Sequence, residues 1–146
     1  MNRIIYITTE QAIQTHSKTI QQSGGGTTDK IDIGKLDSIL EHIQNDDYYP
    51  FFADKLTHLF FSVCQFHCFA DGNKRLAITL SLQFLLLNGY LSTAQTFMKD
   101  TEMVSLKVAD GKIDKDLLLD IMISLLDETY SSNEELKLRI YNAIKK

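Results

Sequence analysis

Apolar residues recur three or four positions apart along most of this chain, which is the spacing of helices with one buried face. The pattern predicts helices at Thr8–Ile20, Leu36–Ile43, Leu56–Phe66, Leu76–Leu87, Met103–Val108, Lys115–Leu126 and Leu136–Ile144. Ile4–Ile7 is different, because its continuous apolar run indicates a short edge strand. We therefore expect an all-α fold, a single compact helical domain over residues 1–146 with a core at about residues 8–127 and a last helix at about residues 132–145.

Local signals mark where several of these helices begin and end. Thr8 and Gln11 have the spacing of a capping box, in which each side chain bonds the backbone N–H of the other residue. Asp114 is a good N-cap for the helix that follows it. Gly89 and Gly111 each follow a helical pattern, where a left-handed residue ends a helix.

The helix predicted at Leu76–Leu87 is apolar on nearly every side, so we expect it to be central and buried. The nine residues before it, 67–75, contain a histidine, an aspartate, a glycine, an asparagine and two cations. A hydrophobic core does not need this density of polar groups. Gly72 and Asn73 form a turn signal, which places the start of the helix at about Asn73.

A helix that begins there has Lys74 and Arg75 in its first turn. The first backbone N–H groups of a helix have no partner within it, and the helix dipole is positive at that end. Anions bind readily at such a terminus, and Gly72 allows a ligand to approach the backbone closely. Residues Gly72, Asn73, Lys74 and Arg75 are therefore candidates for binding phosphate groups.

Three further residues of this stretch suit a phosphate-transfer site, two by their chemistry and one as a structural anchor. His67 titrates near neutral pH and could take a proton from an attacking hydroxyl. Asp71 could hold Mg²⁺, which takes one or two carboxylates together with substrate phosphates. Phe69 is apolar within a polar loop, and we interpret it as the anchor that fixes the loop to the core.

The net charge of −4 argues against broad contact with nucleic acid or an anionic membrane, since such surfaces are usually basic. The chain shows no signal-peptide pattern and no apolar run long enough for a membrane span, so we expect a cytoplasmic protein. Cys64 and Cys68 flank His67, but structural zinc needs four ligands, so Cys64 is interpreted as a small core residue. His16 is interpreted as a core histidine.

The pattern His-x-Phe-x-Asp-Gly-Asn-x-Arg at residues 67–75 resembles the signature of the Fic/Doc family (filamentation induced by cAMP, death on curing). Other stretches resemble its short death-on-curing branch: Ser23–Gly26, Leu36–Leu40, Phe84–Tyr90 and Val108–Ile113. The resemblance implies a Fic-type fold with a short flap or hairpin before the motif, near Gly24–Gly34. Such a flap would pair its main chain with an extended target segment, whereas a plain loop is the alternative.

The resemblance also implies an enzyme that transfers AMP from ATP to a Ser, Thr or Tyr hydroxyl of a target protein. His67 would be its base, Asp71 would hold Mg²⁺, and residues 72–75 would bind the phosphates of ATP. A Doc-like protein kinase, the toxin of a bacterial toxin–antitoxin pair, is the alternative and would move the γ-phosphate. A binding module without catalytic activity is a second alternative.

Two positions depart from the pattern of AMP-transferring members, which have a glycine after the motif's asparagine and a second arginine three residues after the first. Here these positions are Lys74 and Ile78, and Lys74 is the spelling of the kinase-type branch. Ser131 and Glu135 resemble an inhibitory pattern whose glutamate pairs with the missing arginine. We therefore expect control by a separate antitoxin protein rather than by Glu135.

Tyr48 and Tyr49 follow the second predicted helix. They could touch a nucleotide base, but we favour a role in closing the end of the core. His58 lies nine positions before His67 and is expected to be outside the site. The target protein, the identity of an antitoxin and the oligomeric state do not follow from these patterns.

Overall fold

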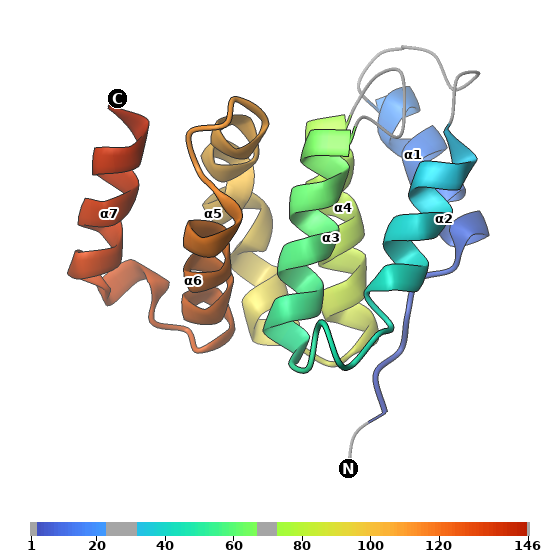
Figure 1. Cartoon of the computed structure of the whole chain (residues 1–146), viewed down its shortest axis with the longest axis horizontal. Helices are drawn as coiled ribbons and strands as arrows, with labels where there is room; N and C mark the ends of the chain where they lie inside the picture. The colour runs from blue at the N-terminus through green and yellow to red at the C-terminus, as the bar shows by residue number, and fades with distance from the viewer. Residues whose placement is uncertain (1–2, 23–31, 67–72, 146) are drawn as a thin grey trace.

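The computed structural model describes residues 3–22, 32–66 and 73–145, and over these residues the chain is built from helices alone (Figure 1). The helices are α1 (Thr9–Gln22), α2 (Ile33–His42), α3 (Phe52–Phe66), α4 (Asn73–Leu87), α5 (Leu91–Ala109), α6 (Lys115–Leu126) and α7 (Glu134–Ile144), with a 3-10 turn, η1 (Tyr130–Ser132), before α7. No strand occurs in these described ranges. The prediction of an all-α, compact helical fold is confirmed.

Helix α4 is at the centre of the packing. It contacts α1, α3 and α5, while α3 also packs against α2 and α6. The apolar side chains of α3 and α4 with no exposed area are Leu56, Leu59, Phe60, Val63, Leu76, Ala77, Leu80, Phe84 and Leu85. After α4 the chain turns at Gly89, whose φ of 83° lies in the left-handed region that glycine tolerates. Both sequence predictions for this helix, its burial and its end, are confirmed.

Successive helices run in alternating directions, which brings four helix ends together at one end of the bundle (Figure 1). These are the last residue of α1, the first of α2, the last of α3 and the first of α4. They flank residues 23–31 and residues 67–72, the two internal segments outside the described residues. Most of the flap predicted near Gly24–Gly34 falls within the first of these segments and stays a prediction, whereas Ile33 and Gly34 belong to the first turn of α2. Its two attachment points lie at the end of the bundle where α4 begins.

The capping signals read from the sequence form as predicted. Gln11 donates its backbone N–H to the Thr8 hydroxyl at 3.1 Å, and Thr8 donates its own to the Gln11 side chain at 3.0 Å. Asp114 accepts the N–H of Leu117 at 2.8 Å and begins α6. These bonds satisfy N–H groups that a helix leaves without partners in its first turn.

The edge strand predicted at Ile4–Ile7 is wrong. This segment has no partner strand among the described residues, and the side chain of Asn88 takes the place of one. Asn88 accepts the Ile5 N–H at 2.8 Å and donates to the Ile5 carbonyl at 2.9 Å. The segment is held in an extended form because one amide side chain satisfies both backbone groups of Ile5.

Helix α5 is longer than the short helix predicted at Met103–Val108, because it begins at Leu91 and has 19 residues. The first half of α5 is rich in polar residues, so the hydrophobic pattern of the sequence did not indicate its buried face. Thr93 and Thr101 of α5 are buried, and Thr101 donates its hydroxyl to the Phe97 carbonyl one turn earlier at 2.7 Å. Neither α5 nor any other helix in the described ranges is long and apolar enough to cross a membrane.

Candidate functional site

Helix α4 begins at Asn73, as the turn signal predicted, and its first turn carries Lys74 and Arg75. Both cations are exposed, and Asn73 is partly exposed. The first N–H groups of α4 and these two charges therefore meet at one helix end, an arrangement that suits an anion. The other predicted site residues lie outside the described residues: His67, Phe69, Asp71 and Gly72.

Lys74 and Arg75 leave the helix on different faces, because neighbouring residues of a helix are about 100° apart. Lys74 lies one turn before the buried Ile78. The positive charge of Lys74 is close enough to the Cys64 thiol on α3 to act on the pKa of that thiol, which it lowers. Arg75 lies one turn before Thr79, whose hydroxyl donates to the Arg75 carbonyl at 3.2 Å. A phosphate placed over the end of α4 would therefore have two cations near it.

The position that is arginine in AMP-transferring relatives of the motif is Ile78, and the structure shows its surroundings. Only 7% of Ile78 is exposed, and it belongs to the hydrophobic core. An isoleucine packed in this way supplies no charge to a ligand. Lys74 and Arg75 are consequently the cations that the first two turns of α4 offer in the described part of the chain.

The last turn of α3, which leads into residue 67, is tied to α5 by two side chains. The Cys64 thiol points to the Ser105 carbonyl at 3.8 Å, and the Gln65 amide donates to the Val108 carbonyl at 2.5 Å. No pattern in the sequence singles out Gln65. The available signal was a polar residue within an apolar run, but its partner lies 43 positions away.

Cys64 is 1% exposed and lies in the core, as predicted. Burial raises the pKa of the Cys64 thiol to about 12, although the positive charge of Lys74 opposes that rise. Cys64 is therefore a protonated thiol near neutral pH, and a thiol in that state is neither a nucleophile nor a metal ligand. The prediction that Cys64 behaves as a small hydrophobic residue is confirmed. His16 is also fully buried, in agreement with its interpretation as a core residue.

A second group of polar side chains surrounds His58 in the middle of α3. The Lys115 ammonium donates to His58 Nδ1 at 2.8 Å, and Ser62 Oγ lies 3.2 Å from His58 Nε2. Because a lysine can only donate, Nδ1 is the acceptor and Nε2 carries the proton. The pKa of His58 is lowered to about 4, mainly by burial and also by the positive charges of Lys115 and His42.

This group is separate from the start of α4. His58 is eight residues before the end of α3, which corresponds to about 12 Å along the helix axis. The Tyr49 hydroxyl lies 3.1 Å from Nδ1 of both His42 and His58, and its ring lies tilted against the His58 ring, with the centroids 4.6 Å apart. Tyr49 thus packs against α3 instead of reaching the end where α4 begins.

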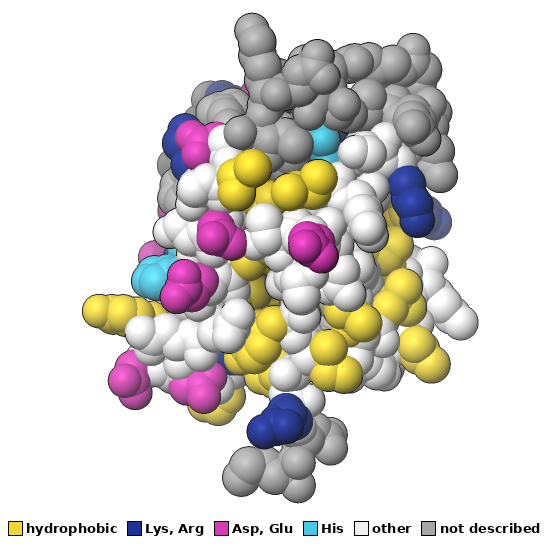
Figure 2. Space-filling model, turned by 90° about the vertical axis from the view of Figure 1, so that its right-hand side faces the viewer, with side chains coloured by type: hydrophobic (Ala, Val, Ile, Leu, Met, Phe, Trp, Pro, Cys, Tyr) yellow, Lys and Arg dark blue, Asp and Glu magenta, His cyan; other side chains and the backbone are white. Residues whose placement is uncertain are grey.

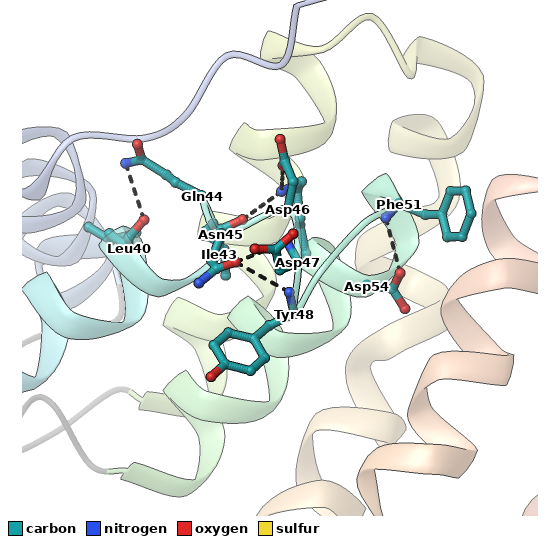
Figure 3. Close-up of polar contacts among 10 residues, drawn as sticks. Leu40, Ile43, Gln44, Asn45, Asp46, Asp47, Tyr48, Phe51 and Asp54 are labelled. Atoms are coloured by element: carbon teal, nitrogen blue, oxygen red, sulfur yellow. Dashed lines mark hydrogen bonds and ion pairs between the residues drawn. The ribbon is translucent and has the colours of Figure 1, made fainter.

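The connection between α2 and α3 explains why only one of the two tyrosines covers the core. The Asn45 side chain accepts the N–H groups of Asp47 and Tyr48 at 2.9 and 3.3 Å, which fixes a tight turn (Figure 3). In that turn Tyr48 is 68% exposed, with its ring beside that of His42 at a centroid distance of 5.5 Å. The prediction that both tyrosines close the core is therefore wrong for Tyr48, whereas Tyr49 is partly buried.

Glu135 does not approach the start of α4. It lies in the first turn of α7, which packs on α6 at the outer edge of the bundle (Figure 1). The first turn of α7 and the first turn of α4 lie at opposite ends of the molecule (Figure 1). In this arrangement Glu135 cannot pair with a cation at the start of α4, which agrees with the expectation that Glu135 is not the inhibitor.

The face formed by α1 and α2 shows carboxylates and apolar side chains side by side (Figure 2). Exposed acidic residues in α2 and the turn after it are Asp37, Glu41, Asp46 and Asp47. This distribution agrees with the net charge of −4 and makes the cations at the start of α4 a local feature. A compact anion such as a nucleotide phosphate fits it better than an extended polyanion does.

Comparison with known proteins gives one family. The model of the Fic/DOC family matches residues 6–85, a range that runs from just before α1 to near the end of α4. It includes residues 67–75 and the first turn of α4. No curated protein and no solved structure gives a significant match to the chain.

Proposed function

Because the chain belongs to the Fic/DOC family, we propose that this Fic-type transferase moves AMP from ATP to a hydroxyl side chain of a target protein. Proteins of this family generally catalyse nucleotide-dependent modification of other proteins. The observation that carries the proposal is the first turn of α4. There, exposed Lys74 and Arg75 lie in the same turn as the first backbone N–H groups of a helix that is anchored in the core.

The transfer is a displacement at the α-phosphorus of ATP. The oxygen of the target hydroxyl forms a bond to that phosphorus, and the bond from phosphorus to the bridging oxygen of pyrophosphate breaks. The imidazole of His67 takes the proton of the hydroxyl, and pyrophosphate leaves with its electron pair. The N–H groups of α4, Lys74 and Arg75 hold the phosphates and stabilise the charge that develops.

Asp71 is the residue of the motif that fits a metal ion. It supplies one carboxylate, and Mg²⁺ in nucleotide sites takes one or two carboxylates and completes its shell with phosphates and water. The ion would neutralise phosphate charge during the displacement. Asp71 has no other role in this proposal.

A Doc-like protein kinase is the second candidate, and the position of Ile78 favours it. In the kinase orientation the γ-phosphate lies at the start of α4, the target oxygen bonds to that phosphorus, and ADP leaves. Without a cation at Ile78, the distal phosphates have no arginine to hold them in the AMP-transfer orientation. A charge-assisted bond is worth about 1.5–3 kcal/mol, enough to influence the choice. The glycine at position 72 favours AMP transfer, because it leaves room for the ester side of the α-phosphate.

A separate antitoxin protein is the regulator that suits either activity. Glu135 lies at the far end of the molecule from the start of α4, so the described helices offer no inhibitory glutamate from α7. We propose that control comes from a partner chain, as in a toxin–antitoxin pair. The third possibility is a module that binds a partner without transferring anything.

The test uses ATP labelled either on the α-phosphate or on the γ-phosphate, incubated with the purified chain, Mg²⁺ and a bacterial extract. AMP transfer predicts protein-bound label from the α position only. Label from the γ position only would contradict AMP transfer and establish the kinase. No label from either, with ATP binding intact, would favour the binding module. A variant with both Arg75→Gln and Lys74→Gln is the control, since it removes the two exposed charges while keeping the helix.

A further inference from the structure

Imidazole and phenol groups from three parts of the chain meet beside the middle of α3. His58 lies on α3, His42 is the last residue of α2, and Tyr49 lies in the connection between these helices. The Tyr49 hydroxyl lies 3.1 Å from Nδ1 of His42 and 3.1 Å from Nδ1 of His58. The centroids of the two histidine rings are 5.3 Å apart. Two nitrogen atoms that can bind a metal ion are therefore gathered around one phenolic oxygen.

The separations of these three atoms are close to those of ligands around a tetrahedral metal ion. Zn²⁺ binds histidine nitrogen at about 2.0–2.1 Å and oxygen at about 2.0–2.2 Å. Two ligand atoms at these bond lengths, on two corners of a tetrahedron, lie about 3.3 Å apart. The two distances of 3.1 Å from the Tyr49 oxygen are only slightly shorter. Small rotations of the side chains would therefore admit the ion.

The hydrogen bonds of His58 leave Nδ1 as the nitrogen with a lone pair. Lys115 Nζ lies 2.8 Å from Nδ1, and because an ammonium group can only donate, Nδ1 accepts. Nε2 then carries the proton and lies 3.2 Å from Ser62 Oγ. Metal-binding histidines usually donate from the second nitrogen in this way, which fixes the tautomer and the orientation of the ring. Lys115 thus already places a positive charge at the atom where a metal ion would bind.

A metal ion can reach this group from solvent through His42. This residue is exposed and lines a surface cavity together with Glu41 and Asn45, whereas His58 is only 8% exposed. In the described ranges, no group of three histidine, cysteine or carboxylate side chains could hold a metal ion. The phenol of Tyr49 is therefore the group that completes a set of three ligands here.

We propose that His42 Nδ1, His58 Nδ1 and the Tyr49 oxygen bind one divalent transition-metal ion of the Zn²⁺ class, with water as the fourth ligand. Imidazole suits Zn²⁺, and three protein ligands with one water is a common zinc arrangement. On binding, Lys115 withdraws from Nδ1, the phenol of Tyr49 releases its proton to solvent, and the ion ties the end of α2 to α3. This site is separate from the start of α4 and does not depend on the proposed transfer reaction.

Calorimetric titration of the untagged chain with Zn²⁺, after removal of metal with EDTA, measures the binding. The expected result is one ion per chain. Tyr49→Phe and His42→Gln should each weaken the affinity at least about tenfold, because loss of a ligand costs no less than loss of a group that orients one. Tyr48→Phe is the matched control. It removes the same hydroxyl from the neighbouring tyrosine, whose ring also lies beside His42, and the affinity should stay within about twofold.

Lys115→Met separates a metal site from a cluster with a purely structural role. It removes the positive charge that competes for His58 Nδ1, so the affinity for Zn²⁺ should rise at least about tenfold. Ser62→Ala removes the partner of Nε2 and should weaken the affinity about tenfold. Loss of packing alone would weaken binding in both variants.

Co²⁺ tests the geometry in the wild type alone, so the proposal stays open to refutation where a variant fails to fold. Bound Co²⁺ should show the strong visible absorption of tetrahedral coordination, and Zn²⁺ should abolish that absorption. The weak absorption of octahedral Co²⁺, or no binding of Zn²⁺ to the wild type, would overturn the proposal. Equal losses of affinity in Tyr48→Phe and Tyr49→Phe would also overturn it, as would binding that persists unchanged in Tyr49→Phe or weakens in Lys115→Met.

Discussion

Replacing His58 by glutamine should make the protein less sensitive to acid. In the folded chain the pKa of His58 is lowered from 6.5 to about 4, mainly by burial and also by the positive charges of Lys115 and His42. The unfolded chain therefore binds a proton at His58 below about pH 6.5, whereas the folded chain does so only near pH 4. Protonation thus favours unfolding, and the free energy of unfolding falls as the pH is lowered through this window.

The size of the effect follows from the two pKa values. Each pKa unit corresponds to about 1.4 kcal/mol, so His58 alone should cost roughly 3 kcal/mol of stability between neutral pH and pH 4. Several groups face this ring: Tyr49 from the turn before α3, His42 from α2, and Lys115 from α6. Asp54 and Asp116 act on Lys115 and keep some of its charge in place.

Glutamine suits this substitution because it keeps the hydrogen bonds and cannot titrate. Its carbonyl oxygen can accept from Lys115, and its amide can donate to Ser62. Urea unfolding followed by circular dichroism at several pH values between 7 and 4 gives the free energies. The wild type should lose about 2–3 kcal/mol more than His58→Gln over this range, since carboxylates titrate equally in both. Lys115→Met should reduce the same loss, because it removes the charge that opposes protonation. Parallel losses in wild type and His58→Gln would refute the reasoning.

Three further predictions concern the motif and the core. His67→Ala should lower transfer about a hundredfold to ten-thousandfold without unfolding the chain, measured as label on protein; an unchanged rate would remove it as the base. Asp71→Ala should abolish turnover and weaken Mg²⁺-dependent ATP binding in calorimetry, and full Mg²⁺ dependence in the variant would place the metal elsewhere. Lys55→Met should lower the free energy of unfolding by about 1–3 kcal/mol, because the fully buried Lys55 donates to the Ile43 carbonyl at 2.8 Å and to Asp46 at 2.7 Å. Urea unfolding measures this free energy. An unchanged value would show that the packing of methionine compensates for the lost bonds.

The central part of the fold could be predicted because local signals and burial agree there. The apolar stretch Leu76–Leu87 indicated a buried helix, and Gly89 and the Thr8–Gln11 box marked helix ends that the structure confirms. The start of α4 at Asn73 followed from the turn signal before it. In these places the sequence neighbours of a residue determine its structure, so no long-range contact had to be known.

Other features depend on contacts between distant residues and were missed. Asn88 replaces a partner strand for Ile5, which is 83 positions away, so an apolar run alone indicated a strand that does not form. Thr93 and Thr101 are buried polar residues of α5, and a hydrophobic pattern reads them as exposed. The Gln65 bond to α5 also requires the tertiary arrangement, because glutamine at the end of a helix is usually a solvated residue.

Mass spectrometry of a modified target peptide tests the central claim most directly. Targets would be isolated after incubation with the chain and ATP, and the mass added to the acceptor hydroxyl would be read together with its fragments. The account predicts an added adenosine monophosphate group on a Ser, Thr or Tyr side chain, absent when His67→Ala replaces the wild type. An added phosphate alone would contradict AMP transfer, and no modification at any residue would contradict the assignment of this protein as an active transferase.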